Sequence, residues 1–167
     1  NSTGTTVDVS RILIKFDLSY ISSSVSSGLI SNPKYYLNLF DAKPTALATS
    51  QSLQAYPVSQ SWTMGDGRSY DDPRTTEGCS WNFKIGETDH KTRDMRMEVT
   101  DIVNKWLSST VPNEGFIVKR EGTIGNTDTD SDEGSTTRFG NFSFFSSDTH
   151  TKYPPTLEVQ WDDSSWS

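Results

Sequence analysis

Hydrophobic and polar residues alternate along several short stretches of the chain, which is the pattern of half-buried β-strands. In residues 11–18 (RILIKFDL), Ile12, Ile14 and Phe16 would face one side, and charged residues would face the other. Further strands are predicted at residues 35–40, 51–59, 95–99, 116–120, 138–146 and 156–161, with a short one around 79–84. Pro57 lacks the N–H needed for a ladder hydrogen bond, so we expect it at a sheet edge or at a strand end.

One segment has helical spacing instead. An apolar stripe runs through residues 102–107, and Trp106 is its largest member. Thr100 is a suitable N-cap, and Asp101 would place a negative charge at the positive end of the helix dipole. Pro112 prevents any continuation of the helix. We therefore expect a helix at about residues 100–108, with Trp106 buried under a sheet.

Turn signals separate these elements. Residues 19–34 are rich in Ser and Gly and end in the turn-forming pair Asn32-Pro33. About seven or eight short strands with one crossover helix predict an all-β fold, an antiparallel jelly-roll β-sandwich with one short α-helix. We expect a single domain over residues 1–161, followed by a polar C-terminal tail at residues 162–167.

Two polar segments interrupt the alternating pattern. Residues 60–94 form a long irregular excursion that is rich in Gly and Asp. Loops of this length usually carry function or an interface, so we expect the domain to meet its partners there. Residues 121–137 are polar and acidic.

Composition and charge narrow the classes of function. Only 32% of the 167 residues are hydrophobic, but 11% are aromatic, which predicts a core of few, large side chains. The net charge of −7 argues against nucleic acid and against an anionic membrane surface, because both need basic patches. No apolar stretch approaches the roughly 20 residues that a membrane span requires.

The residues of enzymatic chemistry are sparse. The only two histidines, His90 and His150, lie in polar segments far apart in the sequence, and no nucleophile elbow or phosphate-binding glycine loop is present. The single cysteine, Cys79, cannot form an internal disulfide and is interpreted as a small hydrophobic residue. We therefore expect no enzymatic activity, no catalytic residues and no bound organic cofactor.

The acidic segment offers a candidate metal site. Asp128, Asp130 and Asp132 alternate along the chain, which places carboxylate oxygens on one side of a loop, and calcium prefers such hard ligands. The spacing begins like an EF-hand loop but departs from it at Glu133, where that loop needs Gly. Calcium binding and a solvated acidic hairpin tip are both open interpretations.

Aromatic residues offer a candidate glycan site. Trp62, Tyr70 and Trp81 lie in or beside the long excursion, where their rings could stack on sugars. The alternative for each Trp is that it pins the loop onto the core. Tyr70 is flanked by polar residues and is expected to be exposed.

Several stretches, in order along the chain, resemble the DNRLRE-type jelly-roll domains, which are related to some carbohydrate-binding modules. The similar stretches are residues 11–19 (RILIKFDLS), 99–107 (VTDIVNKWL), 113–119 (NEGFIVK), 145–148 (FSSD) and 155–159 (PTLEV). The resemblance implies a jelly roll whose crossover helix closes one end. It also implies a further strand before residue 11, so the N-terminal strand is expected to be truncated in residues 1–8.

Other stretches resemble virion structural proteins of tailed bacteriophages, particularly marine ones. They are residues 37–42 (LNLFDA), 55–62 (AYPVSQSW), 64–68 (MGDGR), 144–151 (FFSSDTHT), 153–155 (YPP) and 161–166 (WDDSSW). This resemblance implies a decoration, neck, tail or fibre component that contacts other virion proteins in a symmetric assembly. Its location would be the extracellular virion, assembled in the host cytoplasm. The alternative is a carbohydrate-binding module that recognises surface glycans.

Overall fold

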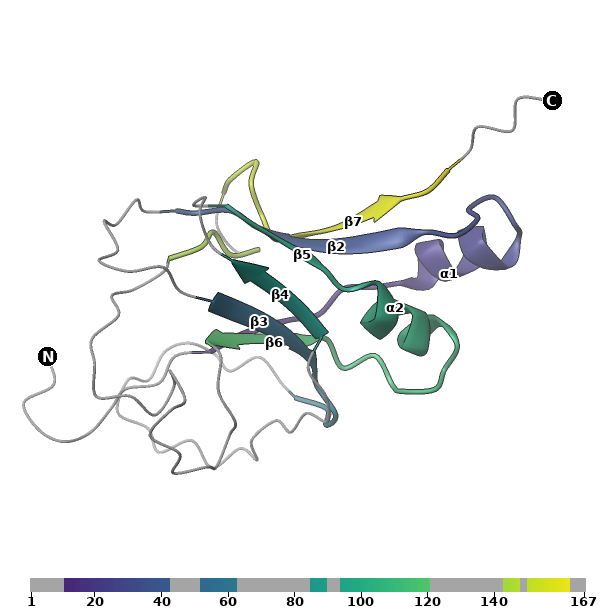
Figure 1. Ribbon diagram of the computed structural model, residues 1–167, viewed down its shortest axis with the longest axis horizontal. Helices are drawn as coiled ribbons and strands as arrows, with labels where there is room; N and C mark the ends of the chain where they lie inside the picture. Colours follow the sequence, from purple (N-terminus) through teal and green to yellow (C-terminus); the bar gives the residue numbers. More distant parts are fainter. Residues whose placement is uncertain are drawn as a thin grey trace, which may run out of the picture.

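The computed structural model describes residues 11–42, 52–62, 85–89, 94–120, 143–147 and 150–162, with backbone alone at residues 52 and 85–89. Its strands form two sheets that face each other (Figure 1). One sheet has the order β1 (Ile12–Ile14), β6 (Phe116–Arg120), β3 (Ser52–Pro57) and β4 (Ile85–Asp89). The other has the order β5 (Met95–Glu98), β2 (Lys34–Leu39) and β7 (Thr156–Gln160). All pairings are antiparallel.

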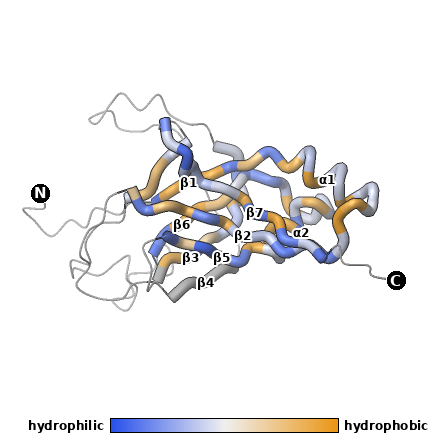
Figure 2. Tube along the Cα trace, turned by 90° about the horizontal axis from the view of Figure 1, so that it is seen from above, coloured by the Kyte–Doolittle hydropathy of each residue, from blue (hydrophilic) through white to orange (hydrophobic). Residues whose placement is uncertain are grey.

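The main core lies between the two sheets. Alternate residues of β2 and β5 point inward, and Tyr35, Leu37 and Met97 have no exposed surface. They meet Ala55 and Phe116 of the opposite sheet. The alternation of hydrophobic and hydrophilic positions is visible along the strands in Figure 2. The chain is therefore an all-β sandwich, as its alternating pattern predicts.

Most predicted strands are confirmed, with small shifts at their ends. The predicted strand at 116–120 matches β6, and Pro57 is the last residue of β3. The strand expected around residues 79–84 falls outside the described residues, and β4 follows it at 85–89. The strand expected at 138–146 is wrong over its described part, where residues 143–147 make only an isolated bridge, between Phe144 and Asp41.

A second helix corrects the expectation of a single one. Residues 19–34 were predicted to be turns, but α1 (Ser19–Ser26) occupies their first half. The hydroxyls of Ser23 and Ser24 donate to the carbonyl oxygens four residues earlier, at 3.0 Å each, so both polar side chains find hydrogen-bond partners within the helix. Leu18 and Ile21 anchor α1 on the core. Tertiary packing therefore overrides the low helix propensity of the serine-rich segment.

The predicted helix is confirmed as α2 (Thr100–Leu107), and its residue Trp106 is buried. The predicted cap is wrong, because Val99 occupies the N-cap position and no side chain caps the helix. Thr100 Oγ1 instead accepts a hydrogen bond from the Tyr35 backbone N–H at 3.0 Å and donates one to Glu98 at 3.1 Å. The residue thus joins α2 to β2. Both helices lie at the same end of the sandwich (Figure 1).

The four-stranded sheet is also buried on its other face. Tyr56, Val58 and Ile117 form a second apolar cluster there, and Leu13 and Trp62 pack against it. These residues alternate along β1, β3 and β6 with residues of the main core, so they point away from the opposite sheet.

Candidate functional site

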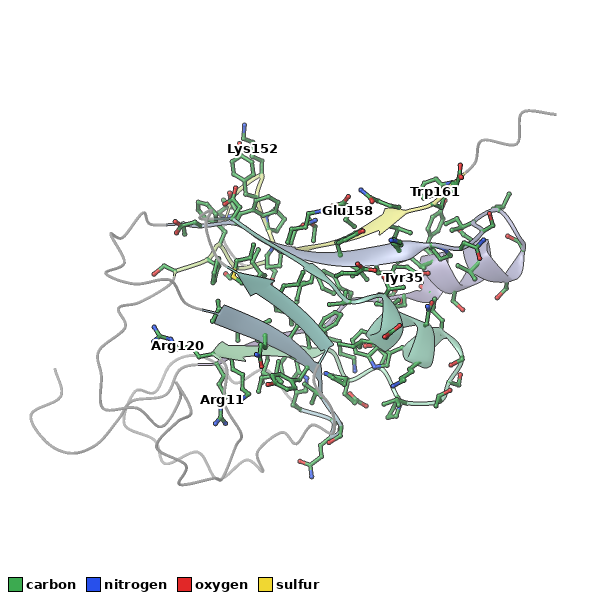
Figure 3. All side chains as sticks on the ribbon, viewed as in Figure 1. Arg11, Tyr35, Arg120, Lys152, Glu158 and Trp161 are labelled. Carbon is green, nitrogen blue, oxygen red and sulfur yellow. The ribbon has the colours of Figure 1, made fainter. Side chains whose placement is uncertain are left out.

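The outer face of the three-stranded sheet carries an ordered set of polar side chains. Tyr36 and Asn38 of β2 alternate with buried residues, as does Arg96 of β5, so all three point away from the core. Glu158 lies opposite Tyr36 in the adjacent strand β7, and Arg96 lies opposite Asn38. Figure 3 shows Glu158 on this outer face and Tyr35 between the sheets. Three strands therefore bring these polar groups to one surface, which we call the Glu158 surface.

Glu158 is the centre of this surface. Arg96 binds its carboxylate in a bidentate pair, with Nε and Nη2 at 3.1 and 3.0 Å from the two oxygens. Asn38 Nδ2 donates to Glu158 Oε2 at 3.0 Å, and Gln160 Nε2 donates to Oε1 at 2.8 Å. The Arg96 guanidinium also lies 3.5 Å from the centre of the Tyr36 ring. Each side chain is thereby held in one orientation by its neighbours.

These contacts set the charge of the surface. The Arg96 hydrogen bonds, followed by the one from Asn38, lower the pKa of Glu158 from 4.5 to about 2. The same pairing raises the pKa of Arg96 above its ordinary value. Both groups therefore stay ionised at neutral pH and would not exchange protons there. The arrangement suits hydrogen bonding to a polar ligand or partner better than acid–base catalysis.

A second group of polar side chains is buried on the far face of the four-stranded sheet. Gln54 and Lys119 are neighbours in the register of β3 and β6, and they are 0% and 2% exposed. Tyr56 Oη donates to Gln54 Oε1 at 2.5 Å, and Lys119 Nζ lies 5.1 Å from the centre of the Tyr56 ring. These side chains adjoin the second apolar cluster, so this face of the sheet buries polar groups beside apolar ones.

Of the three predicted glycan-binding aromatics, only Trp62 is among the described residues; Tyr70 and Trp81 lie outside them. The Trp62 indole is partly buried against the second apolar cluster, and its Nε1 donates to the Glu114 carbonyl oxygen at 2.7 Å. This placement favours the interpretation that Trp62 pins its segment to the core. The structure does not bring Trp62 to the Glu158 surface, since the two lie on opposite sheets.

The other candidate residues fall mostly outside the described ranges. These are Asp128, Asp130 and Asp132, together with His90 and Cys79. His150 does lie among the described residues, and its side chain is exposed. Within the described ranges, no three metal-ligating side chains cluster. None of the helices there is long and apolar enough to cross a membrane.

The Glu158 surface was not predicted from the sequence. Alternation in residues 95–98 and 156–160 would have placed Arg96 and Glu158 on outward faces. Their pairing, however, depends on β2 lying between β5 and β7, and these strands are far apart in the chain. No local signal in the sequence specifies that order.

No family model matches the chain, and no curated protein matches it significantly.

Proposed function

We propose that this domain is a non-enzymatic structural component of a tailed-bacteriophage virion, built as a jelly roll and acting through contacts with other virion proteins in a symmetric particle. The proposal is motivated by the phage-like stretches described above and by the order of the DNRLRE-like stretches along the chain. The all-β sandwich is compatible with such a role.

Two of the phage-like stretches contact each other in the fold. Residues 37–42 include the end of β2 and the three residues after it. Residues 144–147 lie beside those three residues, and Phe144 forms a bridge with Asp41. The Ala42 N–H donates to the Ser143 carbonyl oxygen at 2.7 Å, and the Phe145 N–H donates to the Phe40 carbonyl oxygen at 3.1 Å. The two stretches therefore lie side by side in the fold.

The observation that carries the contact role is an exposed apolar pair at the helix-bearing end of the domain. Leu29 is 76% exposed and Trp161 is 48% exposed. Their segments are adjacent, because Ser31 Oγ donates to the Asp162 carbonyl oxygen at 3.4 Å. Single exposed hydrophobic residues are ordinary, but two on adjacent segments motivate a contact surface at this end.

Purified particles test this proposal. An antibody against the chain should label intact virions in electron micrographs, and the chain should co-sediment with them at a fixed copy number. A tagged Leu29→Ser, Trp161→Ser variant should be incorporated less than a tagged wild-type chain. A Lys34→Ser variant, altered at another exposed position, is the matched control. Recovery of the chain solely from the soluble fraction would contradict the proposal.

Carbohydrate binding is the second candidate, and the Glu158 surface favours it. Its side chains are held in place and carry hydrogen-bonding groups of the kind that bind sugar hydroxyls, although the Arg96 guanidinium covers one face of the Tyr36 ring. A glycan array should then lose its signal with Tyr36→Ala or Asn38→Ala, and keep it with Lys34→Ala. Loss with Trp62→Ala alone would instead favour the loop aromatics, and no signal from the wild type would exclude this candidate.

Calcium binding by Asp128, Asp130 and Asp132 is a separate proposal, motivated by their spacing. Calorimetry with calcium, and with a chelator as control, tests it. Measurable heat together with a rise in thermal stability would support the site, while neither effect would exclude it.

A further inference from the structure

The three-stranded sheet ends in a strand with an unpaired edge. β7 pairs with β2 on one side, and in the part of the chain that the structure describes no strand pairs with its other side. Such an edge presents a row of backbone donors and acceptors that can pair with another strand. Figure 1 shows β7 at the margin of its sheet.

The hydrogen-bonding pattern identifies which residues of β7 present this edge. The Val99 N–H donates to the Tyr35 carbonyl oxygen at 2.8 Å, so the backbone groups of Tyr35 face β5. Backbone groups of successive residues point to opposite sides, so those of Tyr36 face β7 and its partner Glu158. The N–H and C=O groups of Leu157 and Val159 therefore point outward from the sheet.

Two of the usual protections against strand addition are missing from this edge. Neither a lysine nor a bulge interrupts residues 156–160, and the two prolines, Pro154 and Pro155, precede the strand. Trp161 follows the strand directly and leaves 48% of its surface exposed. A partner strand along this edge would contact Trp161 as well.

We infer that β7 pairs antiparallel with β7 of a second copy of this chain, about a two-fold axis at Val159. In this register Glu158 lies opposite Gln160 of the second copy, and Leu157 lies opposite its Trp161. The two Val159 residues exchange both of their backbone hydrogen bonds. The contact joins the two three-stranded sheets into one continuous six-stranded sheet, and its symmetry lets it close as a dimer.

The other symmetric registers are less favourable. An axis at Glu158 places two carboxylates directly opposite each other, and an axis at Gln160 places Glu158 opposite Asp162. An axis at Leu157 places Pro155, which has no N–H, opposite Val159. A second copy fits this edge because, in the register at Val159, Leu157 meets Trp161 and Glu158 meets Gln160 of an identical strand. This inference does not depend on the role in a virion.

Sedimentation velocity of the full chain, from micromolar to millimolar concentration, tests the pairing. Because one short strand forms the contact, we expect a weak dimer whose fraction rises with concentration. Gln160→Glu should raise its dissociation constant roughly three- to thirtyfold, since two symmetry-related pairs become like-charged. The matched control Gln160→Lys faces Glu158 and should preserve or strengthen the dimer. Gln160 is exposed but donates to Glu158 of its own chain, so thermal melting of both variants separates any loss of that contact from loss of the dimer.

A proline variant tests the backbone contact itself. Val159→Pro removes an N–H that faces outward and makes no bond to β2, so it should abolish the dimer. Circular dichroism and thermal melting of this variant report whether the domain still folds. A wild-type chain that stays monomeric at millimolar concentration would overturn the inference. So would a dimer that neither Gln160→Glu nor a folded Val159→Pro weakens.

Discussion

Gly115 lies so close to the carbonyl oxygen of Ile14 that no side chain fits between them. This glycine ends the turn before β6 and has a φ of +88°, a conformation that other residues rarely adopt. Asn113 holds the turn on both sides, since its Nδ2 donates to the Phe16 carbonyl oxygen and its Oδ1 accepts from the Gly115 N–H. The turn therefore sets how β6 meets β1.

Gly115→Ala should destabilise the domain strongly. The strained φ should cost about 1–3 kcal/mol, and the overlap with Ile14 should add a comparable amount. Gly28→Ala is the matched control, because Gly28 has a φ of +73° but no atom near its absent Cβ. Urea unfolding of both variants checks the difference, and equal losses would show that the close approach to Ile14 carries no energy.

The Glu158 carboxylate should make the domain sensitive to acid. In the folded state its pKa is about 2, below the ordinary value of 4.5. Between these two pH values the folded state therefore binds fewer protons than the unfolded state. The stabilisation is present above pH ~4.5 and is lost as the pH falls toward ~2. Urea midpoints over this range should fall less steeply for Glu158→Gln, and also for Arg96→Met. An unchanged slope in both variants would contradict this assignment.

Trp106→Ala should cost about 3–5 kcal/mol. The indole is 6% exposed and packs edge-to-face on Phe116 with ring centres 4.7 Å apart, so its removal leaves a cavity between α2 and the sheet. Trp106→Phe retains an aromatic ring and should cost clearly less. Chemical denaturation measures both changes, and a loss below about 1 kcal/mol for the alanine variant would show that this packing is dispensable.

Tyr35→Phe should stabilise the domain by about 1 kcal/mol, because the Tyr35 hydroxyl is buried with no hydrogen-bond partner in the described part of the chain. Burial raises the pKa of Tyr35 above its ordinary value of 10.0, so the folded wild type should lose stability as the pH rises beyond that value. The phenylalanine variant should lack this contribution. Tyr36→Phe, on the exposed face, is the control, and thermal melting at neutral and alkaline pH compares the three proteins.

Local sequence patterns were sufficient to predict those elements whose buried residues repeat at a single strand or helix spacing. The residues of β6 and α2 match their predicted ranges because their apolar positions repeat at strand and helix spacing. Helix α1 shows where this fails. Leu18, Ile21 and Val25 have helix-compatible spacing, but the serines between them mask it, and the hydroxyl-to-carbonyl bonds that satisfy those serines exist only once the helix has formed.

By itself, the sequence determined that this protein is an all-β sandwich with a helix at residues 100–107, because alternation and helical periodicity are properties of neighbouring residues. Only the tertiary structure decided that Glu158 meets Arg96 and that β7 is the last of the described strands in its sheet. Both depend on strand order, which brings residues 62 positions apart into hydrogen-bond contact. Such long-range pairing is selected by packing of the whole core, and no short segment encodes it.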